Sequence, residues 1–339
     1  MTKLRINLAL QGGGAHGAFT WGVLDRLLQE DDLEIAAISG TSAGALNAAA
    51  LKSGMLGGGH DGGRAALDAL WEAVACSSTA GMSQWFGQEL FSPSMMRKAL
   101  ELSPVYAFAD AINRMTSPYA SGPFYNHPLQ SIVEGLDYGD VCASEGPDLF
   151  IGATNVRSGK VKVFQGAEIG PDALLASACL PTLFRAVEIE GEAYWDGGYT
   201  GNPPLFPLFA RQYPEDILVI NITPLERDEV PQTPQAIQNR INEIGFNTSL
   251  LRELRAISFV QRLISDGTID QGAMKRVHVH MIADDALMNE LSVATKTVAI
   301  PSVLTALKGA GQAAATTFLE KHRGDVSKRS SVCLQAMFG

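Results

Sequence analysis

One serine of this 339-residue chain stands where a nucleophile could work. Gly40-Thr41-Ser42-Ala43-Gly44 has the spacing Gly-x-Ser-x-Gly, in which a sharp strand-to-helix turn exposes the serine hydroxyl. The flanking glycines let neighbouring backbone pass close to the turn. An apolar strand is predicted before the motif, over 35–38, and an Ala-rich helix after it, over 45–51. This context predicts acyl transfer through Ser42, with the helix N-terminus favouring negative charge at the site.

A glycine-rich loop supplies a second candidate for the same chemistry. Gly12-Gly13-Gly14-Ala15-His16-Gly17 also lies between a predicted strand and a predicted helix. Successive backbone N–H groups in such a loop can bind an anion, including the oxyanion of an acyl-transfer intermediate.

The same glycines permit a rival interpretation as a dinucleotide site. Gly12, Gly14 and Gly17 match Gly-x-Gly-x-x-Gly, which in a nicotinamide-dependent oxidoreductase requires an acidic residue at the end of the second strand. Here that strand ends in Ile38-Ser39-Gly40, and Asp31, Asp32 and Glu34 come before it or at its start. A dinucleotide-dependent oxidoreductase is therefore the disfavoured alternative.

The third motif, Asp196-Gly197-Gly198, follows a predicted hairpin strand and by itself would pass for a turn. The three motifs in this order resemble the patatin-like phospholipase family, which has a Gly-rich oxyanion loop, a Gly-x-Ser-x-Gly elbow and an Asp-Gly-Gly/Ala. The resemblance also takes in Ala176-Ser177-Ala178 through Pro181 and Phe184, and Asn202-Pro203-Pro204. It runs from about Leu8 to Pro204, roughly the first 60% of the chain.

The resemblance implies an α/β fold, with three α/β/α layers around a mostly parallel central sheet, and a serine–aspartate dyad without histidine. By this resemblance Ser42 attacks the acyl carbonyl and Asp196 takes its proton. The amides of Gly12, Gly13, Gly14 and Ala43 would stabilise the oxyanion. No cofactor or metal is expected. His16, Gly17, Gly40, Gly44, Gly197 and Gly198 would support these motifs.

One position departs from the family pattern. His16 stands where the family usually has Arg or Lys, a cation that orders the loop or contacts a phosphate. A histidine would carry that charge only if its pKa were raised. The departure weakens the expectation of a phospholipid head-group preference and leaves the expectation of acyl transfer intact.

A histidine-based triad is the main alternative to the dyad. The order Ser42, Asp196, then His278 or His280 follows that of α/β-hydrolases. However, both histidines alternate within a predicted strand over 276–282, whereas a triad histidine normally lies on a loop. We expect them, and His127, to be structural, and we expect His60 and His322 to be exposed.

Alternating strands and helices must position these motifs. The order over the first 51 residues is typical of a parallel sheet covered by helices. Strands are predicted over 4–10, 33–38, 148–154, 160–164, 188–195, 217–223 and 276–282, and helices over 15–29, 45–51, 171–178, 234–263 and after Pro301.

Three segments carry more specific expectations. The glycine-rich stretch 54–63 predicts a surface loop. The stretch 67–115 predicts helices that pack on the sheet or form a cap lining an acyl-chain channel, where these side chains gather: Met82, Trp85, Phe86, Leu90, Phe91, Met95 and Met96. Steps of three, four and seven predict that one apolar face of the 234–263 helix contains Ile237, Ile241, Ile244, Leu251, Leu254 and Ile257.

These elements suggest a single domain over 1–339. Its core would span about 5–225, a helical cap 67–127, and a C-terminal helical extension about 226–339. The composition, with 46% hydrophobic and 18% charged residues, suits a large buried core.

The net charge of −10 disfavours nucleic acid as a partner and disfavours charge-driven attraction to an anionic membrane. A local basic patch stays open in the C-terminal third, with Arg252, Arg255, Arg262, Lys275 and Arg276. Four scattered cysteines without a CxxC pair, no signal-peptide pattern and no long apolar run suggest a cytoplasmic protein, at most peripheral to a membrane. The oligomeric state is left open.

The leading hypothesis is thus a serine hydrolase of lipid acyl esters, similar to phospholipase A or lysophospholipase, that works through an acyl-enzyme at Ser42. A carboxylesterase or thioesterase acting on soluble acyl substrates is the first alternative. A dinucleotide-dependent oxidoreductase and a non-catalytic lipid-binding protein are the others.

Overall fold

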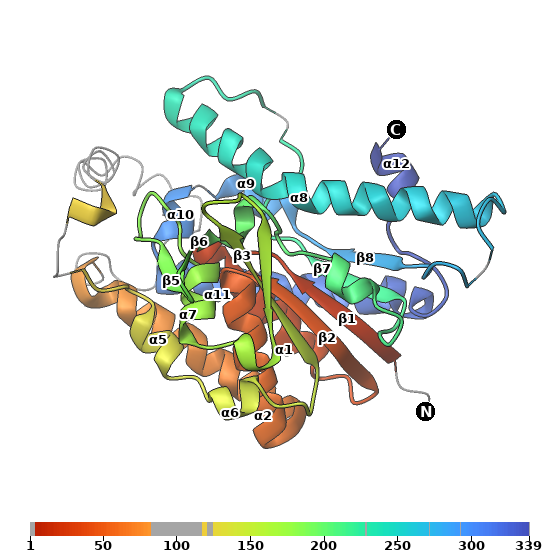
Figure 1. Ribbon diagram of the computed structural model, residues 1–339, viewed down its shortest axis with the longest axis horizontal. Helices are drawn as coiled ribbons and strands as arrows, with labels where there is room; N and C mark the ends of the chain where they lie inside the picture. Colours follow the sequence, from red (N-terminus) through yellow and green to blue (C-terminus); the bar gives the residue numbers. More distant parts are fainter. Residues whose placement is uncertain are drawn as a thin grey trace.

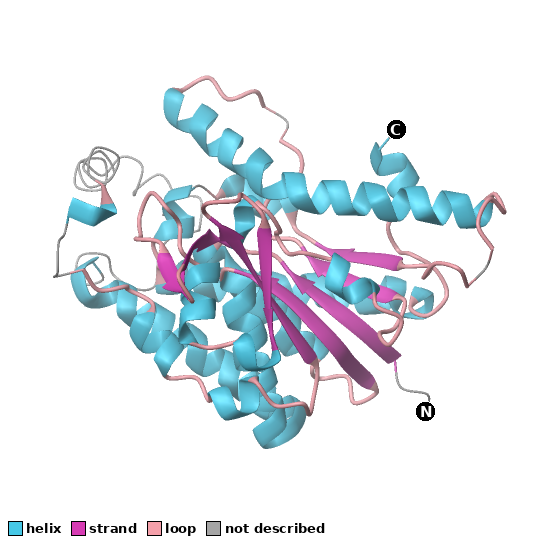
Figure 2. Cartoon of the chain, viewed as in Figure 1, coloured by secondary structure: helices cyan, strands magenta, loops and turns pink. Residues whose placement is uncertain are grey.

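The computed structural model describes residues 4–82, 117–120, 125–227, 229–270, 272–291 and 293–338. Within these ranges the chain forms one eight-stranded sheet with helices on both faces (Figures 1 and 2). The strand order is β5-β6-β3-β2-β1-β7-β8, and β4 also pairs with β3. The strands are β1 (Leu4–Leu10), β2 (Leu33–Thr41), β3 (Asp148–Asn155), β4 (Val161–Gln165), β5 (Val187–Ile189), β6 (Glu192–Asp196), β7 (Asp216–Ile220) and β8 (His278–Ile282).

The parallel part of the sheet gathers the candidate loops at one edge. Strands β3, β2, β1, β7 and β8 run parallel, whereas β4, β5 and β6 join through antiparallel pairs. Leu10 at the end of β1 pairs with Gly40 on one side and with Ile220 on the other. The loops that follow β1, β2 and β7 therefore leave the sheet side by side, as expected for parallel strands.

Alternate residues of the central strands are buried in two separate hydrophobic cores, one on each face of the sheet. Leu8 and Leu10 of β1 are buried in a cluster with α1 (Gly17–Leu27), α2 (Ala43–Met82) and α11 (Pro301–His322). Ala9, between them, faces a second cluster formed with α8 (Pro234–Ser265). Because successive side chains of a strand point to opposite faces, this alternation creates three layers and confirms the predicted α/β/α fold.

The remaining helices of the described residues are short, and several of them pack on the longer helices, as α6 does on α2 and α12 on α8. They are α5 (Gln130–Glu134), α6 (Tyr138–Val141), α7 (Pro171–Ser177), α9 (Asp285–Glu290), α10 (Val293–Thr297) and α12 (Leu334–Phe338). None of the helices in the described ranges has both the length and the apolar character needed to cross a membrane.

The glycine-rich stretch 54–63 is not the surface loop that we predicted. Helical structure runs through it, and only Gly58 and Gly59 have non-helical backbone angles. A Cβ at Gly54 would lie 2.3 Å from the carbonyl oxygen of Gly62. The glycines thus allow two helical segments to pack tightly on either side of a kink.

The predicted apolar face of α8 is only partly correct. Leu254 and Ile257 are buried, but Ile237, Ile241 and Ile244 are exposed by 42%, 55% and 53%. The face turned inward near the start of the helix carries two polar residues instead, Glu243 and Asn247. Both side chains bind partners in other segments, Glu243 with Arg227 and Asn247 with Gln11, and these contacts explain why this side of the helix faces inward.

The predicted helical cap falls largely on residues that the structure does not describe. Residues 67–82 belong to α2, whereas 83–116 and 121–124 lie outside the described ranges, as does most of the predicted Met-rich and aromatic cluster.

Candidate active site

Ser42 occupies the turn between β2 and α2, in the strained conformation that the motif predicts. Its φ is +54°, a left-handed value that is uncommon for a residue with a Cβ. A Cβ at Gly40 would lie 2.6 Å from the carbonyl oxygen of Gly44, and one at Gly44 would lie 2.1 Å from that of Leu10. Both flanking positions therefore require glycine for the turn to close against β1.

A second serine, Ser177, stabilises this turn by a hydrogen bond to its backbone. The Ser42 N–H donates to Ser177 Oγ at 2.9 Å, and Ser177 Oγ donates to the Gly152 carbonyl at 2.6 Å. Ser177 is fully buried at the end of α7 and links the elbow to β3. The sequence pattern Ala176-Ser177-Ala178 marked this stretch, but no role for Ser177 could be derived from it.

Strand β3 brings Asp196 next to the elbow, although 154 positions separate Asp196 from Ser42 in the sequence. Thr41 pairs with Gly152 on one side of β3, and Asp196 pairs with Ala153 on the other. A Cβ at Gly197 would lie 2.2 Å from the Gly152 carbonyl oxygen and 3.0 Å from Thr41 Cγ2. Sheet register thus places the Asp-Gly-Gly turn against the elbow.

The electrostatics of Asp196 suit a base. The residue is only 2% exposed, and burial raises the pKa of its carboxyl to about 7. Hydrogen bonds from the Gly198 N–H, at 2.7 Å, and from the Ser42 side chain partly offset this rise in pKa. A carboxylate that accepts from a serine hydroxyl and has a near-neutral pKa can take the hydroxyl proton near pH 7.

The glycine loop lies directly against Ser42. A Cβ at Gly12 would come within 2.8 Å of Ser42 Cβ, and one at Gly17 within 2.7 Å of Ala43 Cβ. The Gly12 N–H donates to Asn202 Oδ1 at 2.7 Å, and Asn202 Nδ2 donates back to the Gly12 carbonyl at 3.4 Å. The Gly12 amide is therefore occupied, which corrects its predicted place among the oxyanion donors.

The other predicted donors are differently placed. Within the described part of the chain, the N–H groups of Gly13, Gly14 and Ala43 have no hydrogen-bond acceptor. Ala43 is the first residue of α2, so its amide has no partner inside the helix. These three amides, in the loop and helix start next to Ser42, are the candidates for binding an oxyanion.

The glycines of this loop pack closely against other segments of the protein. Gly14 backs onto the Lys296 carbonyl, where a Cβ would come within 2.3 Å, and Gly12 backs onto Thr41 and Asn202. In a dinucleotide fingerprint the glycines serve close approach to a pyrophosphate. Contacts inside the protein explain them here, which argues against that interpretation.

His16 does not replace the cation that the family usually has at this position. It is buried, with Nε2 2.8 Å from Thr295 Oγ1. Burial, and next the nearby Lys296, lower the pKa of His16 well below its usual value, so the ring is neutral near pH 7. Lys296, from α10, is itself half-buried beside the loop, and burial lowers its pKa to about 8.

Helix α8 closes the site from the other face of the sheet. A Cβ at Gly198 would lie 2.4 Å from the ring of Phe246. Asn247 Oδ1 accepts from Gln11 Nε2 at 2.9 Å, and Arg227 and Arg240 both pair with Glu243. These contacts turn the polar residues of α8 inward.

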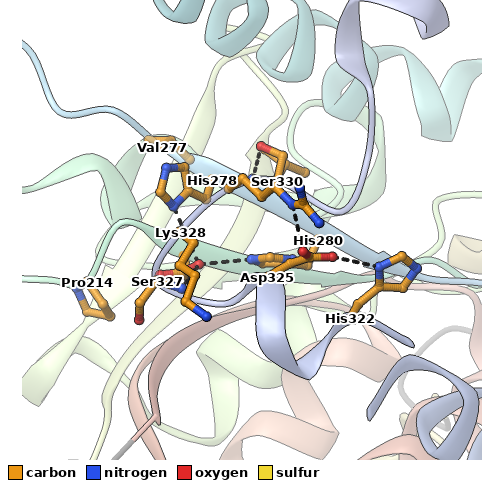
Figure 3. Close-up of polar contacts among 12 residues, drawn as sticks. Pro214, Val277, His278, His280, His322, Asp325, Ser327, Lys328 and Ser330 are labelled. Carbon is orange, nitrogen blue, oxygen red and sulfur yellow. Dashed lines mark hydrogen bonds and ion pairs between the residues drawn. The ribbon is translucent and has the colours of Figure 1, made fainter. Parts of the chain in front are cut away.

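The two strand histidines lie at the opposite end of the sheet from Ser42. His280 Nε2 is 2.9 Å from Asp216 Oδ1, and His278 Nδ1 is 3.6 Å from the same oxygen. Figure 3 shows both histidines beside the segment that carries Ser327 and Ser330. Because Asp216 and His278 pair at the start of β7 and β8, neither ring joins Ser42. The geometry favours a structural role for both.

The other histidines that we predicted to be structural or exposed form no hydrogen bond with Ser42 or Asp196 among the described residues. His127 is buried against Phe184, with ring centroids 4.5 Å apart, and burial lowers its pKa to about 4. His60 and His322 are half-buried rather than exposed, and His322 pairs with Asp325. Across the residues with described positions, no three His, Cys, Asp or Glu side chains are grouped to hold a metal ion.

A comparison with known families decides where the chain belongs. The model of the patatin-like phospholipase family matches residues 8–209. The chain is a member of this family. Patatin-like proteins are generally lipid acyl hydrolases, and the match contains the glycine loop, the elbow and the Asp-Gly-Gly turn.

Individual proteins are only distantly similar to this patatin-like chain. A search of the curated proteins gave no match. Among solved structures, VipD from Legionella pneumophila has 15% identity and a TM-score of 0.44, covering 94% of this chain and 67% of that one. The ExoU–SpcU complex of Pseudomonas aeruginosa has 17% identity and a TM-score of 0.31, covering 95% of this chain and 61% of that one. This chain thus spans less than two thirds of the latter.

Proposed function

We propose that the protein is a serine hydrolase that cleaves lipid acyl esters through a Ser42–Asp196 dyad. In the first half-reaction Ser42 Oγ attacks the acyl carbonyl carbon while Asp196 accepts the hydroxyl proton. The tetrahedral oxyanion is stabilised by the N–H groups of Gly13, Gly14 and Ala43. Collapse breaks the ester C–O bond, and the proton passes from Asp196 to the departing alcohol oxygen.

Water completes the cycle in the second half-reaction. Its oxygen attacks the acyl carbonyl of the Ser42 ester while Asp196 accepts a proton from it. The bond between the acyl carbon and Ser42 Oγ then breaks, and the serine recovers its proton from Asp196. The products are the free acid and the alcohol, and the enzyme is regenerated without a cofactor.

One observation carries the proposal: a strained Ser42 donates to a buried Asp196 whose pKa is near neutrality. No histidine of the described residues takes part in this contact. Both partners are held by separate networks, Ser42 by Ser177 and Asp196 by the Gly198 N–H. Such preorganisation is what a nucleophile and its base need.

Two features bear on the substrate. Family membership supports a lipid substrate. The exposed Ile237, Ile241 and Ile244 support it too, because they offer an apolar surface on α8. The same helix packs its Phe246 against Gly198, next to Asp196. The neutral His16 supports a second candidate, an esterase or thioesterase that does not recognise a phosphate, because the loop lacks a cation at this position.

Active-site labelling tests the catalytic proposal directly. A fluorophosphonate probe should modify Ser42, located by mass spectrometry, and should fail to label Ser42→Ala. Labelling of another residue would disprove the assignment of the nucleophile. A panel of lysophospholipid, phospholipid vesicles and acyl-CoA then separates the two substrate candidates, because only the lipid hydrolase should prefer the first two.

A further inference from the structure

A second concave surface lies at the end of the sheet remote from Ser42. It is a groove of about 1210 Å³ between the second half of α8, the start of β8 and the C-terminal segment with α12. We call it the basic groove, because six cationic side chains line it: Arg252, Arg255, Arg262, Arg276, Lys328 and Arg329. The acidic residue in its lining is Asp266.

This concentration of positive charge contrasts with the rest of a chain of net charge −10. Elsewhere, arginines such as Arg5, Arg26 and Arg64 have carboxylate partners. In the groove Arg329 pairs with Asp325. Among the described residues, no carboxylate forms an ion pair with the four other arginines of the groove, which are Arg252, Arg255, Arg262 and Arg276.

Several groups in the groove are already held in place. The Arg255 guanidinium lies over the Phe338 ring at 5.0 Å, and that of Arg262 lies over Phe259 at 5.4 Å. Arg252, Arg255, Phe259 and Arg262 recur at helical spacing, so α8 presents them on one face. Stacking on aromatic rings restricts a guanidinium before a ligand arrives, which reduces the entropy cost of binding.

A buried histidine adds a directed polar group. His278 lines the groove and is only 7% exposed. Its Nδ1 faces Asp216 Oδ1 at 3.6 Å, which leaves Nε2 as the ring nitrogen for the groove. Lys328 lies beside it (Figure 3). The arrangement combines guanidinium forks, an ammonium and an imidazole around one cavity.

We propose that the basic groove binds a ligand bearing two or more phosphate groups, at a site separate from the catalytic one. Planar guanidinium groups match phosphate oxygens in bidentate geometry, and several unpaired arginines favour more than one phosphate. An extended nucleic acid fits less well, because the overall negative charge opposes its approach.

Binding of inorganic pyrophosphate, measured by calorimetry on the full chain, tests the proposal. Saturable binding is expected in the wild type, and Arg255→Gln with Arg262→Gln should weaken it about tenfold per arginine. A control variant, Arg5→Gln with Arg157→Gln, removes two exposed arginines outside the groove and should bind within about twofold of the wild type.

Vesicles distinguish a soluble ligand from a lipid head group. Phosphatidylcholine vesicles with phosphatidylinositol bisphosphate are compared with phosphatidylserine vesicles of equal total charge. Groove-dependent binding to the first alone identifies a lipid head group, and binding to pyrophosphate alone identifies a soluble ligand. The proposal is overturned by no saturable binding to either probe, by equal loss in the control variant, or by equal binding to both vesicles.

Discussion

Two buried aspartates at opposite ends of the same sheet have pKa values shifted in opposite directions. Asp196 and Asp216 are each 2% exposed. Within the described residues, the Asp196 carboxyl accepts hydrogen bonds from two neutral donors, the Ser42 side chain and the Gly198 N–H, and burial raises its pKa to about 7. Asp216 lies 2.9 Å from His280 Nε2 and accepts a hydrogen bond from the Ser327 N–H, with His278 Nδ1 3.6 Å away, and its pKa is held far below the usual range.

The difference shows that burial alone does not make a base. Burial opposes ionisation in both places, but two imidazoles and an amide outweigh it at Asp216. That carboxylate stays ionised and ties β7 and β8 to the C-terminal segment. At Asp196 the partners are too few to offset burial, so the carboxyl titrates where acyl transfer needs a base.

The largest expected effect is on activity, which should depend on the end of the sheet with Asp196 and not on the end with Asp216. Ser42→Ala and Asp196→Asn should each lower kcat/KM for p-nitrophenyl esters on the order of 10⁴-fold, because nucleophile and base act as a unit. His278→Ala combined with His280→Ala should keep activity within about tenfold per folded molecule. A double histidine variant that is folded and inactive would refute the dyad.

Replacing Asp196 should raise the free energy of unfolding, although it lowers activity. Since its folded pKa, about 7, exceeds the unfolded value near 4, wild-type stability falls as pH rises between these values. Asp196→Asn cannot ionise and should be up to about 4 kcal/mol more stable than the wild type at pH 8. Urea unfolding at pH 4 and pH 8 checks this, and the difference should nearly vanish at pH 4.

Removing the other aspartate should destabilise the fold without stopping the reaction. Asp216→Ala leaves the buried imidazole of His280 and the Ser327 N–H without their shared partner, which should cost about 3 kcal/mol. In the wild type this stability is present above pH 4 and is lost as pH falls below the usual aspartate pKa. Urea unfolding measures the loss, and kcat per folded molecule should stay within about threefold. A much larger loss of kcat would link the two ends.

The pH–rate profile sharpens the contrast further. Only ionised Asp196 can accept the serine proton, so kcat/KM should fall tenfold per unit below a pKa of about 7. At pH 5 the value should be about a hundredfold below the plateau. A profile that is flat down to pH 5 would mean that Asp196 is not the base.

The smallest effect concerns the serine that holds the elbow. Ser177→Ala removes the acceptor of the Ser42 N–H, and a lost buried hydrogen bond costs about 1–2 kcal/mol. We expect kcat to fall about tenfold with KM nearly unchanged, measured on the same ester. Ser158→Ala, an exposed serine on the β3–β4 turn, is the matched control and should be silent.

The sequence by itself determined most of the elements and singled out Ser42 as the candidate nucleophile. Strand, turn and helix around Ser42 depend on residues within a few positions, and Gly40 and Gly44 can be understood from that short stretch. Most strands, and the hairpin before Asp196, follow from local alternation and turn residues for the same reason.

Tertiary structure decided what lies around Ser42. Sheet register across β3 places Asp196, and packing over long sequence separations occupies the Gly12 amide with Asn202 and makes His16 neutral beside Lys296. The inward face of α8 was likewise set by partners of Glu243 and Asn247 rather than by helical periodicity. Burial and long-range partners determine these properties, and no local pattern encodes them.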